Sequence, residues 1–126
     1  MSEGPIFSHL DTLDWETAAD QKAEVAALAA EADAAGARRA RLTRGEHGFH
    51  SHISEMPAGF EVPPHTHSVS ELMVILEGSI EVSDGTILDA GDTAVIPADH
   101  LYGFTVGGAG VRFLVTRTED AATRIK

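Results

Sequence analysis

From residue 38 onward, the sequence divides into short runs of alternating character that are separated by glycine, proline and aspartate at short, regular intervals. Alternation with a period of two predicts strands at residues 38–44 and 49–56. An almost continuous apolar run predicts a buried central strand at 71–77, and short runs between turn residues predict strands at 93–96, 101–106 and 111–116. The segment Glu81 to Leu88 predicts a hairpin with a two-residue turn at Asp84 and Gly85. Strands spaced in this way are typical of an antiparallel sandwich or a small barrel.

The first 36 residues differ from this pattern. Residues 1–13 have no clear period and predict an arm or a short edge strand. Residues 15–35 are rich in strong helix formers, with Asp14 as a predicted N-cap and Gly36 as the predicted stop. A narrow apolar stripe predicts a helix that packs against the sheet, or alternatively a dimer contact or a lid over a cavity. We therefore expect one domain, with an arm and helix over 1–36 and a barrel over 37–126.

Composition excludes several classes of function. The chain of 126 residues has no cysteine, so disulfides, thiolate ligands and cysteine nucleophiles are excluded. A formal net charge of −11 disfavours both nucleic acid and anionic membranes as partners. We expect the local cluster of Arg38, Arg39, Arg41 and Arg44 to pair with the domain's own carboxylates. No predicted membrane span or secretion signal is visible, so the expected location is the cytoplasm.

A candidate metal site lies within the stretch Gly59 to Gly78. His65 and His67 are two residues apart, so their side chains leave the same face of an extended strand, about 7 Å apart. After a short bend, Glu71 can return a carboxylate to the same point. Such an N,N,O set with open positions suits one divalent ion, namely iron, manganese, nickel or zinc, in a reactive site. A bound cation would also compensate the cost of burying Glu71 beside an apolar strand.

Two stretches carry a family resemblance. The spacing of Gly59, His65, His67, Glu71 and Gly78 resembles the first conserved motif of the cupin superfamily, with every fixed position filled. Gly91 and Pro97 resemble the start of the second cupin motif. The resemblance implies an all-β fold, a cupin-type antiparallel jelly-roll barrel, with the N-terminal α-helix as an addition.

The resemblance also implies a ligand set of two histidines, the glutamate and a later histidine. In the second motif, however, Asp99 stands at a position where glycine is usual, and Tyr102 stands at the position of the later histidine. His100 lies two residues earlier and points the same way as Tyr102 if this segment is extended. Either side chain is therefore a candidate fourth ligand or catalytic group.

Further candidates lie on neighbouring strands. His50 and His52 share one face of the strand at 49–56, and they are candidates for a general base or for contacts with substrate. Arg112 lies on an apolar strand, where it either anchors a substrate carboxylate or emerges at an edge, and we favour the edge.

Many cupins are enzymes that act on small molecules and form dimers, so the resemblance implies a small organic substrate and a homodimer. Two mechanisms remain open: an iron-dependent oxygenase, or a lyase, cyclase or isomerase in which the metal polarises a carbonyl. A cupin that binds or senses a metabolite without turnover is an alternative from another class, and a metal-free dehydratase-like or structural cupin is a third.

Overall fold

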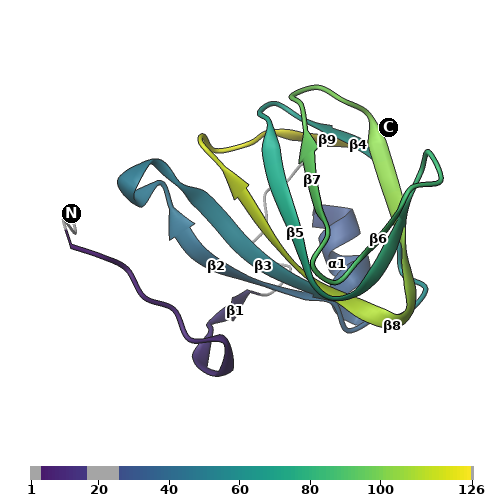
Figure 1. The fold of residues 1–126 in the computed structure, drawn as a ribbon, viewed down its shortest axis with the longest axis horizontal. Coiled ribbons are helices and arrows are strands. Elements are labelled where there is room, and N and C mark those ends of the chain that lie inside the picture. The colour runs from purple at the N-terminus through teal and green to yellow at the C-terminus, as the bar shows by residue number, and fades with distance from the viewer. Residues whose placement is uncertain (1–3, 17–25, 126) are drawn as a thin grey trace.

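The computed structural model describes residues 4–16 and 26–125, and within these residues it consists mainly of β-strands (Figure 1). A short 3-10 helix (Leu10–Thr12) precedes the first strand and another (Glu46–Gly48) lies between the second and third. The elements in chain order are β1 (Trp15–Glu16), α1 (Ala26–Ala34), β2 (Arg38–Arg44), β3 (His50–Met56), β4 (Glu61–His67), β5 (Glu71–Val82), β6 (Ile87–Asp89), β7 (Thr93–Ile96), β8 (Tyr102–Arg117) and β9 (Thr123–Ile125).

The strands form one antiparallel sheet that curls around a common interior (Figure 1). Its order is β1-β2-β3-β8-β4-β9, and β5 pairs with β8 and carries β6 and β7. β8 is the central strand, because residues 102–105 pair with β4 while residues 111–117 pair with β3. Because β8 pairs with different strands along its length, the sheet bends into a barrel. The predicted all-β fold is therefore confirmed.

The inner side of the sheet carries a continuous apolar core. Phe104 and Phe113 meet edge to face, with ring centroids 5.9 Å apart. The buried members of the core are Val62, Met73, Ile75, Ile80, Tyr102, Phe104, Val106, Val111, Phe113 and Val115. Most come from alternate positions of β5 and β8, as expected for strands with one side against a core.

The expected helix over residues 15–35 is only partly correct. Trp15 and Glu16 form β1, which pairs with Ala40 and Arg39 of β2. Tertiary contacts explain the difference, because Arg38 stacks over the Trp15 ring at 3.8 Å and Glu16 forms ion pairs with two arginines of β2. Asp14 therefore precedes a strand and does not cap a helix.

The later part of the helix prediction is confirmed. Helix α1 covers Ala26–Ala34, and Gly36 follows it with φ of +98°, as its predicted role as a stop requires. Residues 17–25, which hold much of the predicted apolar stripe, lie outside the described residues. No described helix is both long and apolar enough to cross a membrane.

The two strands predicted at 101–106 and 111–116 are one element, β8. Residues 107–110, the predicted loop, form a bulge in it: Gly78 of β5 pairs with Val111, but Ile80 already pairs with Val106. Gly78 has φ of +77°, and a Cβ added there would collide with the carbonyl oxygen of Gly110. Only glycine fits this crossing, which gives a physical reason for the last residue of the first motif.

The predicted hairpin between β5 and β6 is present, but its turn is one residue longer than expected. The Val82 N–H donates to the Thr86 carbonyl at 2.7 Å, which leaves Ser83, Asp84 and Gly85 in the turn. Gly85 has φ of +94°, as is usual for glycine in three-residue hairpin turns.

Candidate functional site

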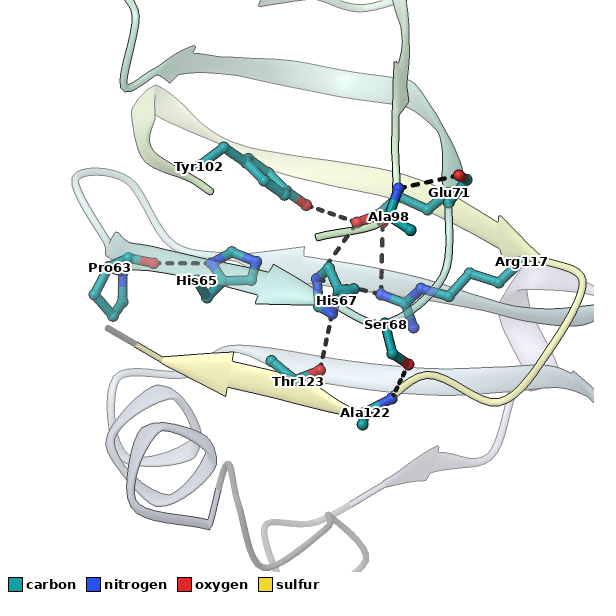
Figure 2. A network of polar contacts seen from close by, with 11 residues as sticks. Pro63, His65, His67, Ser68, Glu71, Ala98, Tyr102, Arg117, Ala122 and Thr123 are labelled. Atoms are coloured by element: carbon teal, nitrogen blue, oxygen red, sulfur yellow. Dashed lines mark hydrogen bonds and ion pairs between the residues drawn. The ribbon is translucent and has the colours of Figure 1, made fainter. Parts of the chain in front are cut away.

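The strands β4 and β5 bring His65, His67 and Glu71 to one region of the barrel interior (Figure 2). The imidazole centroids of His65 and His67 are 4.7 Å apart. The His67 Nε2 lies 3.3 Å from Glu71 Oε1. Residues 68–70 bend the chain between the two strands, so the glutamate returns to the histidines as the spacing predicted.

The orientation of both imidazole rings is determined by contacts at Nδ1. The His65 Nδ1 lies 2.8 Å from the Pro63 carbonyl oxygen. Because a carbonyl only accepts hydrogen bonds, this nitrogen carries the proton and Nε2 keeps its lone pair. Nδ1 of His67 lies 2.8 Å from the hydroxyl of Thr123 on β9. In Figure 2 the other nitrogen of His65 points toward His67, so both free nitrogens face the same region.

Both histidines are neutral at physiological pH. Burial lowers the pKa of His65. Burial, and then the positive charge of Arg117, lowers the pKa of His67 to about 3. Neutral imidazole is the form that binds metal ions.

Glu71 is buried, and two groups besides His67 contact its carboxylate. The Tyr102 hydroxyl donates a hydrogen bond of 2.8 Å to Oε1. Arg117 places Nη2 at 3.5 Å from Oε2, and the same nitrogen lies 3.5 Å from His67 Nε2. Burial and the negative charge of Glu71 raise the pKa of Tyr102, so its phenol stays protonated. Arg117 thus places a guanidinium group beside Glu71.

The residues of this cluster fit a divalent ion in donor type and in protonation state. Two neutral imidazoles and a carboxylate are suitable ligands, and metal-binding histidines commonly have the other ring nitrogen held as it is here. In the described part of the chain, no three histidine, aspartate or glutamate side chains are close enough together to hold an ion as they stand. A bound ion would therefore require a small closure of the donors.

Comparison with known proteins identifies the family. The family model described as the cupin domain matches residues 46–116, which is more than half of the chain. The chain belongs to the cupin family. No curated protein matches it in sequence.

Several solved structures resemble this cupin. An RmlC-like cupin from Shewanella frigidimarina has 23% identity and a TM-score of 0.67, and the match covers 95% of this chain and 96% of that chain. A sugar phosphate isomerase of the cupin superfamily from Silicibacter pomeroyi has 22% identity over 94% of this chain and 80% of that chain, with a TM-score of 0.67. The polyketide cyclase RemF from Streptomyces resistomycificus has 25% identity over 71% of this chain and 70% of that chain, with a TM-score of 0.61. These similarities support the cupin fold.

The second motif departs from the family pattern, and the structure shows how. Asp99 has φ of +62°, a left-handed conformation that aspartate tolerates in place of the usual glycine. This turn breaks the extended course on which His100 and Tyr102 would point the same way. Tyr102 is 5% exposed and faces Glu71, whereas His100 is exposed and does not join the cluster.

The two candidate histidines of β3 differ in position. His52 is 5% exposed, and its neighbours Arg39, Arg117, Arg41 and His67 all influence its charge. Burial is the main reason why the pKa of His52 is well below its usual value. His50 is half-buried and lies beside Gly45 at the end of the strand. Of the two, His52 is the one that lies close to the site.

Sequence reasoning missed two residues of the site. Arg117 follows Phe113 and Val115 at steps of two on β8, so strand parity alone was enough to place it on the inner side. Thr123 comes from β9, after a loop, and no pattern in the sequence connects it with His67. Arg112 lies toward the outside, where it pairs with Glu55 and Glu77, as the favoured edge interpretation expected.

Proposed function

We propose that this cupin binds one divalent metal ion through His65, His67 and Glu71 and acts on a small organic molecule inside the barrel. The observation that carries the proposal is the pairing of each Nδ1 with a partner, Pro63 or Thr123, which leaves both Nε2 atoms available, with that of His67 3.3 Å from the buried Glu71 carboxylate. A metal ion bound there would supply a Lewis acid that polarises a substrate carbonyl.

We further propose that the reaction is a proton transfer of the isomerase, lyase or cyclase type. Tyr102 holds its proton at the phenolic oxygen, 2.8 Å from Glu71 Oε1, and can pass it to a substrate atom close to this cluster while a proton released from another atom of the substrate returns to the phenolic oxygen, so that the phenol is restored. Glu71 then orients the phenol and accepts its hydrogen bond in the ground state. The activity named for RemF, a cyclase with 25% identity to this chain, belongs to the same broad class.

Metal content tests the first part of the proposal. Protein purified without added metal is compared with His67→Ala and with the control His100→Ala, which changes an exposed histidine outside the cluster. We expect about one equivalent of a single metal in the wild type and the control, and much less in His67→Ala. Equal, substoichiometric metal in all three proteins would overturn the proposal.

The visible spectrum of the cobalt(II) protein tests the role of Tyr102. Because we assign Tyr102 to proton transfer and not to ligation, Tyr102→Phe should leave the d–d bands unchanged. A changed coordination spectrum would instead make the phenol a ligand. Tightly bound iron with substrate-dependent oxygen uptake would favour the oxygenase mechanism over proton transfer.

A further inference from the structure

A group of basic side chains lies on the inner side of the sheet, next to the site described above. Paired residues of antiparallel strands point to the same side, and β2 pairs Arg41 with His52, while β3 pairs His52 with the buried Val115. Arg39 and Arg117 lie two residues from Arg41 and Val115 respectively, so they face the same side. The positive charge of each of the three arginines contributes to lowering the pKa of His52.

Nearby carboxylates balance only part of the positive charge of these guanidinium groups and accept only some of their hydrogen bonds. Glu16 contacts both Arg39, at 3.4 Å, and Arg41, at 3.1 Å, while Glu71 contacts Arg117 at 3.5 Å. Three positive groups thus share two carboxylates in these contacts. The Nε atoms of Arg39 and Arg117 are buried and have no hydrogen-bond acceptor among the described residues. Buried donors without acceptors are costly, and an anion supplies both the charge and the acceptors.

The neighbouring arginines outside this group behave differently. Arg38 points to the other side of β2, where its side chain is 47% exposed and pairs with Glu55 at 2.6 Å. Arg39, Arg41 and Arg117 are only 23%, 17% and 12% exposed. The incomplete pairing therefore belongs to the inner side, where a small molecule in the barrel would lie.

We propose that Arg39, Arg41 and Arg117 form a subsite that binds an anionic group, a carboxylate or a phosphate, of the molecule that enters the barrel. The guanidinium fork matches the oxygens of either group. That this molecule is the substrate rests on the function proposed above. Binding of its anionic group does not require the metal. Contact with Glu71 through Arg117 places the subsite next to the Tyr102 hydroxyl, so the subsite orients an acidic substrate toward it.

Isothermal titration of metal-free protein with inorganic phosphate and with malonate, at ionic strength matched with chloride, tests the subsite. We expect saturable binding of at least one of them, and the tighter ligand indicates whether a phosphoryl or a carboxylate group is recognised. Arg39→Gln and Arg41→Gln should each weaken this binding about tenfold, because each removes a charged donor. Arg38→Gln makes the same charge change on the outer side of the same strand and should bind like the wild type.

Arg39→Lys provides a conservative variant that keeps the charge if Arg39→Gln does not fold, and it should bind with intermediate affinity because it lacks the planar fork. Wild-type protein that binds neither anion more strongly than chloride would overturn the proposal. So would equal loss of binding in Arg38→Gln and Arg39→Gln. His67→Ala separates the two proposals, because we expect it to lose metal but to keep anion binding.

Discussion

Arg117 lies 3.5 Å from the carboxylate of Glu71 and 3.5 Å from His67 Nε2, so a guanidinium stands beside the donors proposed for a metal ion. A buried carboxylate requires a cation nearby, and this chain contains one that it can use in the absence of metal. The two cations would therefore compete for Glu71, and this competition can be measured.

Replacing Arg117 with methionine should have opposite effects on the two forms of the protein. The metal-free form should lose about 1 to 3 kcal/mol in free energy of unfolding, because Glu71 keeps only its contacts with Tyr102 and His67. Affinity for zinc or manganese should rise by about tenfold, because the competing charge is removed. Urea unfolding in EDTA and metal titration measure these effects. Arg112→Met, whose arginine pairs with Glu55 and Glu77, is the control, and an unchanged metal affinity in Arg117→Met would contradict competition.

Replacing Thr123 with valine should weaken metal binding without unfolding the barrel. The change removes the hydroxyl that holds His67 Nδ1 at 2.8 Å while keeping the shape of the side chain. Losing such a partner typically lowers metal affinity about 10- to 100-fold. Competition with a chromophoric chelator measures this affinity. Thr105→Val, at an exposed position of β8, should bind metal like the wild type, and a similar loss in both variants would point to a general effect on the sheet.

The buried histidines should make the metal-free protein sensitive to acid. His52 and His67 have folded-state pKa values below the ordinary value of 6.5, to about 3 for His67, because burial and neighbouring arginines disfavour their charged forms. The unfolded chain takes up protons below about pH 6.5, whereas the folded chain does not, so stability is highest above that pH and falls as the pH drops toward the folded pKa. We expect a loss of about 1 kcal/mol per histidine between pH 7.5 and 5.5.

Urea unfolding at these two pH values tests this acid sensitivity. The double variant His52→Gln and His67→Gln should lose the part of the pH dependence that these two histidines contribute and keep the part from His65, whose pKa is also lowered by burial, although the variant is less stable overall. His100→Gln, which changes an exposed histidine, should keep it. An equal change of unfolding free energy with pH in the double variant and the wild type would exclude these buried histidines as the source of the acid sensitivity.

Two glycine variants separate the stability cost of a left-handed backbone from the cost of a steric collision. Gly85→Ala places alanine at φ of +94° with nothing within 4 Å of the new Cβ, so it should cost about 1 kcal/mol. Gly78→Ala adds a collision with the Gly110 carbonyl to a similar strain at φ of +77°, so it should cost at least about 3 kcal/mol or prevent folding. Thermal and urea unfolding compare the two variants, and equal costs would mean that the crossing of β5 and β8 adapts easily.

Local patterns in the sequence determined most of the barrel and the centre of the site. Alternation located β2 and β3, an apolar run located the first part of β5, and turn residues marked the ends of the later strands. The spacing of His65, His67 and Glu71 placed their side chains together, because strand parity and a short bend are properties of neighbouring residues. The resemblance to the cupin motif depended on the same local spacing.

The tertiary structure alone decided which groups complete the site and where the N-terminal segment lies. Trp15 and Glu16 form a strand against helix propensity, because their partners lie on β2. The contacts of Glu71 with Arg117 and of His67 with Thr123 join residues that are far apart in the chain, and only the pairing of strands brings them together. Such contacts depend on register and closure of the whole sheet, and no local pattern encodes these.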